Sequence, residues 1–494
     1  MPAVQWILSV FVLAGAIPLL TGCYQSAVAA LHRFGRSVPA GPVVEPRVAV
    51  VVPAWNEAAV IGRTIDTLAG LEYPPDRLRV YVVDDASTDE TPEIVVAKAR
   101  EYPGRVFHLR RERGGEGKAH TLNHGLRCIH AEGWFEAVLI IDADVIFTAR
   151  SLSMMVRHFR EPRVGAVTAY IKEGSRPANY LNRFIAYEYA NAQAGARRAQ
   201  NLLGAHACLA GGAQLIRRAS LEAIGGVIDT SSLAEDTVTT LNIQLDGARV
   251  VFEPHAIVWA EEPRGIPALW KQRLRWARGN VQVTRRFHKI WLRGRRVGRL
   301  GSVSFALIWF STLLMPLFMV TASASLVALF LMDRGVSLEL FRTLWAVNLA
   351  AYLFVTLSTF SFDPQAARTS WAQGFAFPGL ISLTIILYAF DPPFADAHGG
   401  DLIRHLGVDP SSGLGTALLL FAYVWLAASM LAAYAMKLLA GLRWTAWMAR
   451  PLLYVVGFGP LLCSIAAAAF VEEARGTALV WEKTEKLGAV GDLA

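Results

Sequence analysis

The sequence predicts an α/β domain with a mostly parallel sheet, joined to membrane-spanning α-helices. In residues 45–300, short apolar runs alternate with helical patterns, which is typical of βαβ units. The 494-residue chain is 54% hydrophobic and only 18% charged, and most of the charge falls within residues 45–300. This composition is too apolar for an ordinary soluble enzyme and indicates a protein that lies partly in lipid.

The N-terminal stretch predicts a membrane helix. Residues 6–31 carry no charge and are long enough to cross a bilayer of about 30 Å. Residues 20–23 look like a lipoprotein cleavage box, but no Lys or Arg precedes them, so we favour an uncleaved helix. Arg33 and Arg36 follow, and the positive-inside tendency then places the next part of the chain in the cytoplasm.

Neither the charge nor the cysteines indicate nucleic-acid binding or a disulfide framework. The net charge is +8, but its densest run, residues 285–299, has seven Lys or Arg beside an apolar segment, as in a membrane collar. The four cysteines lack metal or disulfide spacing and are expected to be reduced packing residues: Cys23, Cys128, Cys208 and Cys463.

The central region reads as alternating strands and helices after a Pro/Gly linker at residues 39–46. Apolar runs predict strands at residues 48–52, 78–83, 106–109, 137–141 and 164–168. Helices are expected after the first strand (Val60, Ile61, Ile65 and Leu68 on one side), from near Pro92, and at residues 119–129.

Polar side chains follow three of these strands at their carboxyl ends, where ligands bind in parallel sheets. The pairs are Asn56 with Glu57, Asp84 with Asp85, and Asp142 with Asp144. Together they would form an edge that accepts hydrogen bonds from a base and a ribose while its far end holds a metal. For Ser87 and Asp89 we favour caps on the following helix.

Residues 139–145 read Leu-Ile-Ile-Asp-Ala-Asp-Val. In an extended strand, residues i and i+2 point to the same face, so Asp142 and Asp144 would present two carboxylates side by side. Carboxylates suit Mg²⁺ or Mn²⁺, and a cation held by only two of them keeps positions free for substrate phosphates. Taken alone, this pattern is more often a turn or a helix cap.

A Gly-rich turn at residues 114–118 leads into a helix and ends in Lys118. It lacks the glycine spacing and the Ser/Thr of a Walker loop. Lys118 is therefore either a solvated surface residue or, opposite the acidic edge, a contact to phosphate or uracil.

Two later stretches add candidates for the sugar and for proton transfer. Around Gly211, small residues at 209–213 would let the backbone pass close to a bound sugar. Glu235 and Asp236 open a helix that runs through Ile243. They either complement the helix dipole or provide a general base, and Asp236 is the candidate.

Residues 272–276 read Gln-Arg-Leu-Arg-Trp. On a helix, Gln272, Arg275 and Trp276 share one face. A planar donor fork beside a flat aromatic suits a diphosphate and a sugar ring. An amphipathic membrane helix would carry Arg and Trp as well, so both interpretations remain.

From residue 302 the chain is largely apolar. Candidate spans are residues 303–332, 343–359, 377–390, 414–436 and 452–470. The first can break at Pro316. The third is short and either re-entrant or interfacial. Five spans place the acidic segment 391–409 outside, and Lys437, Arg443 and Arg450 inside. They also place residues 472–494 outside, where Lys483 and Lys486 fit less well, so the parity stays open.

With these motifs in place, the chain resembles the membrane-integrated glycosyltransferase family 2, which includes cellulose, hyaluronan, chitin-oligosaccharide and poly-N-acetylglucosamine synthases. The resemblance covers residues 45–300 in detail and rests on the order of the motifs at 53–57, 84–85, 118, 142–144, 235–236 and 272–276. It implies a membrane helix (1–38), a cytoplasmic GT-A type nucleotide-sugar-binding domain with interfacial helices (39–300), a transmembrane region (301–472) and a tail (473–494).

The resemblance also implies roles on the donor side. Pro53, Glu57 and Asp85 would border the nucleotide, with Lys118 nearby. Asp142 would contact nucleotide or metal, and Asp144 would bind the Mg²⁺ or Mn²⁺ that bridges the diphosphate.

On the acceptor side, the resemblance implies that Asp236, next to Glu235, deprotonates the acceptor hydroxyl, so that the anomeric configuration is inverted. Arg275 would stabilise the departing diphosphate, and Trp276 would form the floor of the acceptor site. Gln272 and Gly211 would complete the substrate contacts.

The implied activity is transfer of a sugar from a UDP-sugar to a growing polysaccharide by a multi-pass protein of the plasma membrane. The Gln-x-x-Arg-Trp motif is associated with chain-extending members, which favours a polymer over the alternative, a single transfer to a lipid or polyprenyl phosphate. No cyclic-dinucleotide module is recognisable, which counts against a regulated cellulose synthase. Residues 481–486 look like an ending seen in some bacterial members, which either gates the site or is a solvated helix end. A non-catalytic scaffold or transporter is the rival from another class.

Overall fold

The computed structural model describes residues 3–32, 44–390, 413–478 and 486–490. The chain forms two compact units. An α/β unit comprises Ala27–Arg264, Arg278–Ala306 and Glu473–Ala494, and a helical unit comprises Met1–Ser26, Gly265–Ala277 and Leu307–Glu472.

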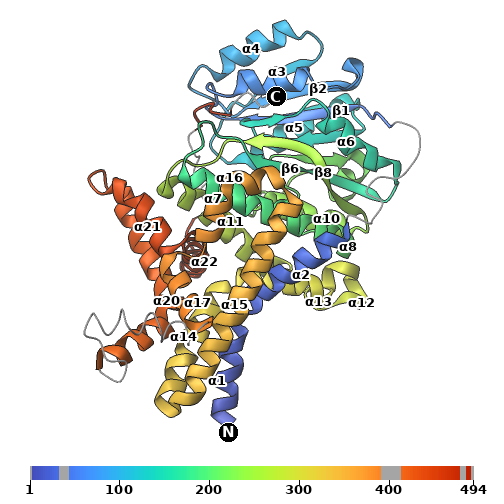
Figure 1. Ribbon diagram of the computed structural model, residues 1–494. Coiled ribbons are helices and arrows are strands. Elements are labelled where there is room, and N and C mark those ends of the chain that lie inside the picture. Colours follow the sequence, from blue (N-terminus) through green and yellow to red (C-terminus); the bar gives the residue numbers. More distant parts are fainter. Residues whose placement is uncertain (1–2, 33–43, 391–412, 479–485, 491–494) are drawn as a thin grey trace. The chain divides into compact units, whose positions relative to one another are not determined.

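One sheet of eight strands organises the α/β unit (Figure 1). Across the sheet the strands are β3 (Val106–Arg110), β2 (Leu78–Asp84), β1 (Val48–Ala54), β4 (Ala137–Ile140), β7 (Gln214–Arg217), β6 (Val164–Glu173), β8 (Arg249–Ala260) and β5 (Val145–Phe147). Strands β7 and β5 are antiparallel to their neighbours, whereas the other pairings are parallel. The predicted α/β class with a mostly parallel sheet is confirmed, and the five predicted strands are present.

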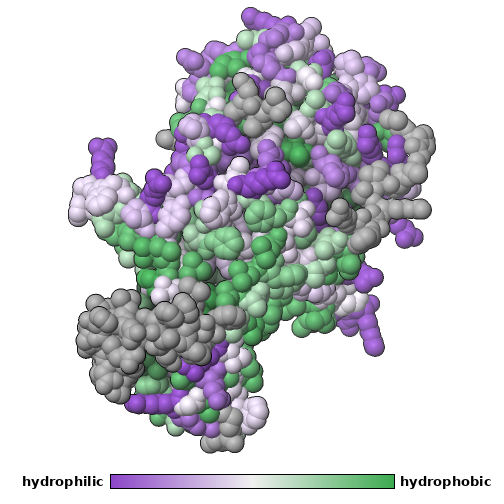
Figure 2. All heavy atoms as spheres, viewed as in Figure 1, coloured by the Kyte–Doolittle hydropathy of each residue, from purple (hydrophilic) through white to green (hydrophobic). Residues whose placement is uncertain are grey.

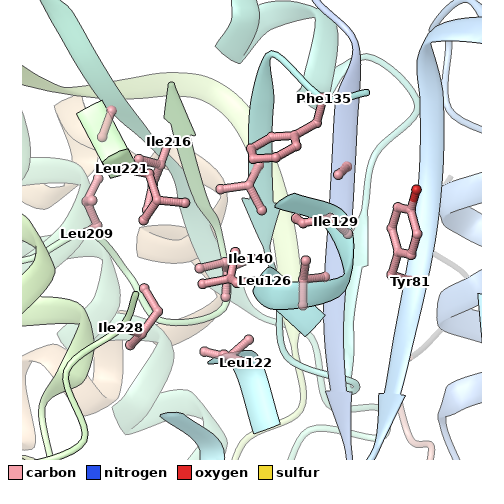
Figure 3. Close-up of a cluster of buried hydrophobic side chains, with 14 of the residues drawn as sticks. Tyr81, Leu122, Leu126, Ile129, Phe135, Ile140, Leu209, Ile216, Leu221 and Ile228 are labelled. Atoms are coloured by element: carbon pink, nitrogen blue, oxygen red, sulfur yellow. The ribbon is translucent and has the colours of Figure 1, made fainter. Parts of the chain in front are cut away.

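Helices follow the first three strands, as their sequence patterns predict. They are α3 (Ile61–Ala69), α4 (Thr91–Glu101) and α5 (Lys118–Glu132). In α5, Leu122, Leu126 and Ile129 recur at helical spacing and pack against a buried cluster that includes Val51 and Tyr81 (Figure 3). This packing fixes the start of α5, and therefore Lys118, at the carboxyl ends of the strands.

The remaining helices of the α/β unit lie between the later strands or follow them. They are α6 (Ser151–Val156), α7 (Tyr180–Tyr189), a π-helical turn (Ala190–Gly195), α8 (Ala196–Leu203), α9 (Arg218–Ala223), α10 (Glu235–Leu245) and α12 (Gly294–Val297). Helix α11 (Ile266–Arg286) supplies residues to both units.

The helical unit has its own apolar core, which includes Leu326, Phe341 and Tyr423. Its helices are α1 (Ala3–Ala14), α2 (Ile17–Leu31), α13 (Val303–Leu313), α14 (Met315–Met332), α15 (Arg334–Phe362), α16 (Pro364–Ala376), α17 (Leu380–Phe390), α20 (Gly413–Gly441), α21 (Ala449–Val456) and α22 (Phe458–Arg475), of which α2, α13 and α22 extend into the other unit. Figure 2 shows hydrophobic side chains gathered over the membrane-type helices and hydrophilic ones over the α/β unit.

Among the described residues, three helices are long and apolar enough to cross a membrane: Met315–Met332, Arg334–Phe362 and Thr416–Gly441. Two bent pairs raise this number to five if each pair is one span, namely α1 with α2, bent by 46°, and Ala446–Val456 with Phe458–Arg475, bent by 101°. Residues 303–332 break at Leu314, directly before Met315 and Pro316, as expected.

Three predictions for the apolar segments have different outcomes. The candidate span at residues 452–470 contains a break, because Gly457 has a left-handed φ of 109° and ends α21, so it is one span only if the bent pair crosses as a unit. The short segment at 377–390 contains α17, which has only 11 residues and is too short to span. The acidic segment 391–409 lies outside the described residues.

Candidate active site

Asp142 and Asp144 lie in a turn between β4 and β5, and not in an extended strand as the sequence suggested. Strand β4 ends at Ile140, and the N–H of Val145 donates to the carbonyl oxygen of Asp142 at 3.2 Å. The reason is topological: β5 is antiparallel to β8, so the chain has to reverse direction after β4. The backbone at Asp142 and Asp144 is therefore a turn, which was the alternative interpretation of this sequence pattern.

Both carboxylates nevertheless hold a cation. Lys118 Nζ lies 2.5 Å from Asp142 Oδ1, and Lys486 Nζ lies 2.6 Å from Asp144 Oδ2. Such charge-assisted contacts are stronger than hydrogen bonds between neutral groups. Asp142 and Asp144 thus each form an ion pair with a lysine, which a turn by itself does not require.

Lys118 is a buried residue at the centre of the site. Its ammonium also donates to the carbonyl oxygen of Gly211 at 3.1 Å and lies 3.6 Å from Glu235 Oε1. Burial lowers the pKa of Lys118, but the carboxylates of Asp142 and Glu235 outweigh burial and raise the pKa above its usual range. Lys118 is therefore a charged group that links three loops, and not a solvated surface lysine.

Asp236 also lies next to Gly211. Helix α10 begins at Glu235, and Asp236 Oδ1 accepts a hydrogen bond from the N–H of Thr237 at 2.7 Å. A Cβ atom on Gly211 would stand 3.1 Å from Asp236 Oδ2 and 3.4 Å from Lys118 Nζ. Five predicted residues thus come together: Lys118, Asp142, Gly211, Glu235 and Asp236.

The loop after β1 is held by the loop after β2. Pro53 pairs with Val83 in the sheet, and the next residues donate backbone N–H groups across the gap: Asn56 to Ser87 Oγ at 2.9 Å, Glu57 to Thr91 Oγ1 at 2.8 Å and Ala58 to Asp89 Oδ2 at 3.1 Å. The expected capping role is wrong for Ser87, because Glu90 is the N-cap of α4 and Ser87 Oγ accepts from Asn56 instead. Asp89 keeps part of that role, since its Oδ1 accepts from the first helical N–H, that of Thr91, at 3.0 Å.

Asp84 and Asp85 differ in their surroundings. Asp84 is fully buried, accepts from the N–H of Ser87 at 2.8 Å and pairs with Arg110 at 3.2 Å. Burial raises its pKa, but hydrogen bonds from His108 and Ser87 outweigh burial and the net shift is downward. Asp84 is therefore a structural carboxylate.

Asp85 fastens the Gly-rich turn to the sheet. Its carboxylate accepts from the N–H of Gly115 at 2.9 Å and forms an ion pair with Arg111. A Cβ atom on Gly114 would fall 1.9 Å from the carbonyl oxygen of Asp85, so only glycine fits there. This close approach brings the start of α5, and with it Lys118, to the site.

The carboxylates of Asp142 and Asp144 fit a metal ion that also binds the phosphates of a substrate. Among the residues that the structure describes, no group of three or more His, Cys, Asp or Glu side chains is arranged to hold a metal ion. Asp142 and Asp144 supply two carboxylates that already hold ammonium groups. Mg²⁺ is typically bound through one or two carboxylates together with substrate phosphates, which fits this pair.

The Gln-x-x-Arg-Trp residues lie on α11 as predicted, in the part of this helix that belongs to the helical unit. The guanidinium over the Trp276 ring is that of Arg273, 4.3 Å from the ring centroid. The roles of Gln272, Arg275 and Trp276 stay predictions.

Lys486, which belongs to the ending predicted either to gate the site or to be a solvated helix end, contacts Asp144, whereas no motif in the sequence pointed to Glu261. The nearest available signal was two consecutive glutamates, Glu261 and Glu262, directly after the apolar run of β8.

Several known proteins resemble parts of this chain. The profile of the family described as "Glycosyltransferase like family 2" matches residues 46–279. The probable glycosyltransferase YdaM of Bacillus subtilis is 33% identical over 244 residues, which cover 49% of this chain and 57% of that protein. A poly-beta-1,6-N-acetyl-D-glucosamine synthase of Staphylococcus epidermidis is 28% identical over 237 residues, which cover 48% of this chain and 55% of the synthase. The chain thus spans little more than half the length of these relatives.

Among solved structures, the mannosyltransferase PcManGT of Pyrobaculum calidifontis, in complex with GDP-Man and Mn²⁺, aligns with a TM-score of 0.56 at 25% identity, covering 74% of this chain and 99% of that one. The alignment supports a GT-A fold for this chain. Residues 46–279 thus resemble a glycosyltransferase domain of family 2.

Proposed function

We propose that this protein is an inverting membrane glycosyltransferase that transfers a sugar from a UDP-sugar to a growing polysaccharide chain. The observation that carries the proposal is the convergence of Asp142, Lys118 and Asp236 around Gly211 at the carboxyl ends of the strands. The poly-beta-1,6-N-acetyl-D-glucosamine synthase among the relatives supports a polymer as the product.

The nucleotide binds at the interlocked loops after β1 and β2. Pro53, Glu57 and Asp85 border it, on a platform made rigid by the hydrogen bonds between the two loops. Lys118, charged and buried, lies within reach of the diphosphate. Lys118 already forms an ion pair with Asp142. A bound diphosphate would therefore place the ammonium of Lys118 between two negatively charged groups.

Asp236 takes the proton of the acceptor hydroxyl. The hydroxyl oxygen then bonds to the anomeric carbon while the bond from that carbon to the diphosphate oxygen breaks on the opposite face, so the configuration is inverted. The electron pair leaves with UDP, and Arg275 stabilises this charge from α11. Gln272, Glu235 and Gly211 line the substrate, and Trp276 packs against the acceptor sugar.

Asp142 and Asp144 would hold Mg²⁺ or Mn²⁺, which supplies charge stabilisation to the leaving diphosphate. The catalytic domain faces the cytoplasm, where UDP-sugars are made, and the membrane helices provide an exit path for the polymer. The positive residues after the first helix, Arg33 and Arg36, support this orientation.

The test is UDP release by the purified full-length protein with UDP-glucose and UDP-N-acetylglucosamine, each with Mn²⁺, with Mg²⁺ and with EDTA. We expect metal-dependent release with at least one donor, and a product of many sugars per acceptor. Release that stops at one sugar per acceptor would replace the polymer with a single transfer to a lipid. Absence of release with both donors and both metals would count against an enzyme and favour a nucleotide-binding scaffold.

A further inference from the structure

Residues 285–303 form a strongly basic element on the surface of the α/β unit. Seven Lys or Arg fall within residues 285–299, and no Asp or Glu occurs in the element. All seven side chains are exposed. Among the described residues, only Arg286 of these seven has a carboxylate partner, Asp229 at 2.6 Å. The other cationic side chains thus face solvent without compensating charge, which favours an anionic partner.

Two large apolar side chains are exposed within the same element. Leu292 is 66% exposed and Val303 is 73% exposed, whereas Phe287, Ile290 and Leu300 are buried. The buried residues attach the element to the α/β unit, so the two exposed ones are not needed for its core. Exposed apolar side chains among cationic ones are typical of a surface that enters the headgroup region of a bilayer.

The backbone presents Leu292 in a fixed and strained conformation. Its φ of 58° lies in the left-handed region, which leucine rarely adopts and which is enriched at functional sites. The chain closes on itself at Gly294 and Gly301, because a Cβ atom on Gly301 would stand 2.6 Å from the nitrogen of Gly294. The rings of Trp291 and Phe305 stack with their centroids 5.9 Å apart. The element is therefore ordered before any partner binds, which lowers the entropic cost of binding.

The headgroups of anionic phospholipids match both properties of this element. Val303 is the first residue of α13, an apolar helix of 11 residues, and the candidate membrane span Met315–Met332 follows it in the chain. Basic residues so close to a membrane span are attracted to an anionic leaflet. A nucleic acid would also meet the positive charge, but it would give Leu292 and Val303 no apolar environment.

The start of the element is tied to the loop that carries the candidate base. Arg286, at the end of α11, pairs with Asp229 and donates to Ser231 Oγ at 2.8 Å. About one turn earlier on α11, Gln282 Oε1 accepts from the N–H of Leu233 at 3.0 Å. The end of α11 thus holds the loop that leads directly into α10.

We propose that residues 285–303 bind the headgroups of anionic phospholipids, and that this anchoring stabilises the loop before Asp236 and raises turnover. The lipid site stands apart from the proposed function. The effect on turnover rests on the proposed function, because that proposal assigns the base to Asp236.

The first test measures lipid association without donor or metal. Electron paramagnetic resonance of spin-labelled phosphatidylglycerol and phosphatidylcholine is recorded in vesicles that contain the full-length protein. The wild type should prefer the anionic label by about threefold, and the preference should weaken with added NaCl because salt screens exposed charges. A variant that combines Arg293→Gln, Arg295→Gln and Arg296→Gln should lose most of this preference. Equal preference in this variant and the wild type would overturn the lipid site.

The matched control combines Arg100→Gln, Arg127→Gln and Arg157→Gln. These exposed arginines lie on α4, on α5 and in the turn after α6, so the control removes the same charge from other parts of the α/β unit. It should keep the wild-type preference for the anionic label. A loss as large as that of the first variant would show that net charge alone attracts the lipid, and would overturn the assignment to residues 285–303.

The second test measures hydrogen exchange of the Leu233 amide in bilayer discs. The discs contain phosphatidylcholine alone, or phosphatidylcholine and phosphatidylglycerol in equal parts. The amide should exchange more slowly in the mixed discs for the wild type, with no such difference for the variant without Arg293, Arg295 and Arg296. The same exchange in both kinds of disc for the wild type would overturn the coupling to the loop.

UDP release supplies the functional readout in the same discs. The wild type should release UDP about threefold faster in the mixed discs, because a better-held loop positions the base more accurately. Glycerol phosphate in solution, added to discs of phosphatidylcholine alone, should change neither exchange nor UDP release. Activation by glycerol phosphate equal to that by the lipid would mean that the element binds free phosphate, and would overturn the membrane assignment.

The two proposals fail in distinguishable ways. If the lipid preference and the slower Leu233 exchange are found but no UDP is released, the proposed reaction fails and the lipid site stands. If UDP is released equally in both kinds of disc and the variant without the three arginines keeps the wild-type lipid preference, the reaction stands and the lipid site fails.

Discussion

The Lys118 ammonium lies 2.5 Å from the carboxylate of Asp142 and 3.6 Å from that of Glu235, so one buried lysine joins the turn after β4 to the start of α10. These two places hold the residues proposed for the leaving group and for the acceptor. Their relative position thus depends on a single side chain that comes from a third element, α5.

Replacing Lys118 with Met should leave two neighbouring carboxylates without their shared cation. We expect kcat to fall about 100-fold, the usual effect of losing one preorganised charge, and the affinity for UDP to fall as well. Lys118→Arg should recover only part of kcat, because a planar guanidinium does not fit a site shaped for an ammonium. Steady-state UDP release and calorimetric UDP binding measure both effects. Activity within threefold of wild type would show that Lys118 only shapes the loop.

The long buried strands were predictable from the sequence, whereas the short ones were not. β1 reads as a run of small apolar residues because both of its faces are buried, and its residues 48–52 have no exposed surface. β5 and β7 have three and four residues, and they form because β8, β4 and β6 offer them partners. A pattern of so few residues cannot be told from a loop in the sequence alone.

The site was predictable where the motif itself fixes the contact. Asp142 and Lys118 follow strand and turn patterns that place them at one edge of the sheet. Lys486 belongs to an ending with two possible interpretations, and its contact could not be predicted because its partner Asp144 is distant in sequence and residues 486–490 are held by Glu261. Tertiary pairing of this kind leaves no periodic signal in the chain.

Asp236→Asn should abolish turnover and spare donor binding. The amide cannot take the acceptor proton, and general-base catalysis is typically worth 10²–10⁴-fold, so kcat should fall by about 1,000-fold. UDP binding should change little, because the proposed role of Asp236 is on the acceptor side. Asp246→Asn, an exposed position at the end of the same helix, is the control for helix stability. Turnover retained by Asp236→Asn would mean that another group is the base.

Glu173 should make stability depend on pH. Burial raises the pKa of this carboxyl to about 7, and the nearby Glu262 adds to the shift, against the opposing effects of Ser175 and Arg176. The folded state therefore holds its proton more tightly than the unfolded chain, whose pKa is near 4.5. Stability from this group is fully present below about pH 4.5, declines as the pH rises to about 7 and is lost above it, by an amount on the order of 3 kcal/mol.

Glu173→Gln replaces the titrating carboxyl with an amide that binds no proton in this pH range. The Tm of the variant relative to wild type should rise between pH 5 and pH 8, as measured by thermal unfolding in detergent. Glu93→Gln, at an exposed position in the first turn of α4, should show no such trend. A Tm difference between Glu173→Gln and wild type that is the same at both pH values would show that Glu173 does not titrate in this range.

Gly211→Ala tests how closely the base and Lys118 approach each other. The added methyl group would stand 3.1 Å from Asp236 Oδ2, so the carboxylate has to move by a few tenths of an ångström. Because Gly211 does not have a left-handed φ, the backbone accepts alanine without strain, and the Tm should stay unchanged. We expect kcat to fall about tenfold, since small displacements of a positioned group are costly in catalysis. Gly441→Ala on α20, where a Cβ atom meets nothing within 4 Å, is the control. A wild-type kcat for Gly211→Ala would show that the position of Asp236 tolerates this shift, and would weaken its assignment as the base.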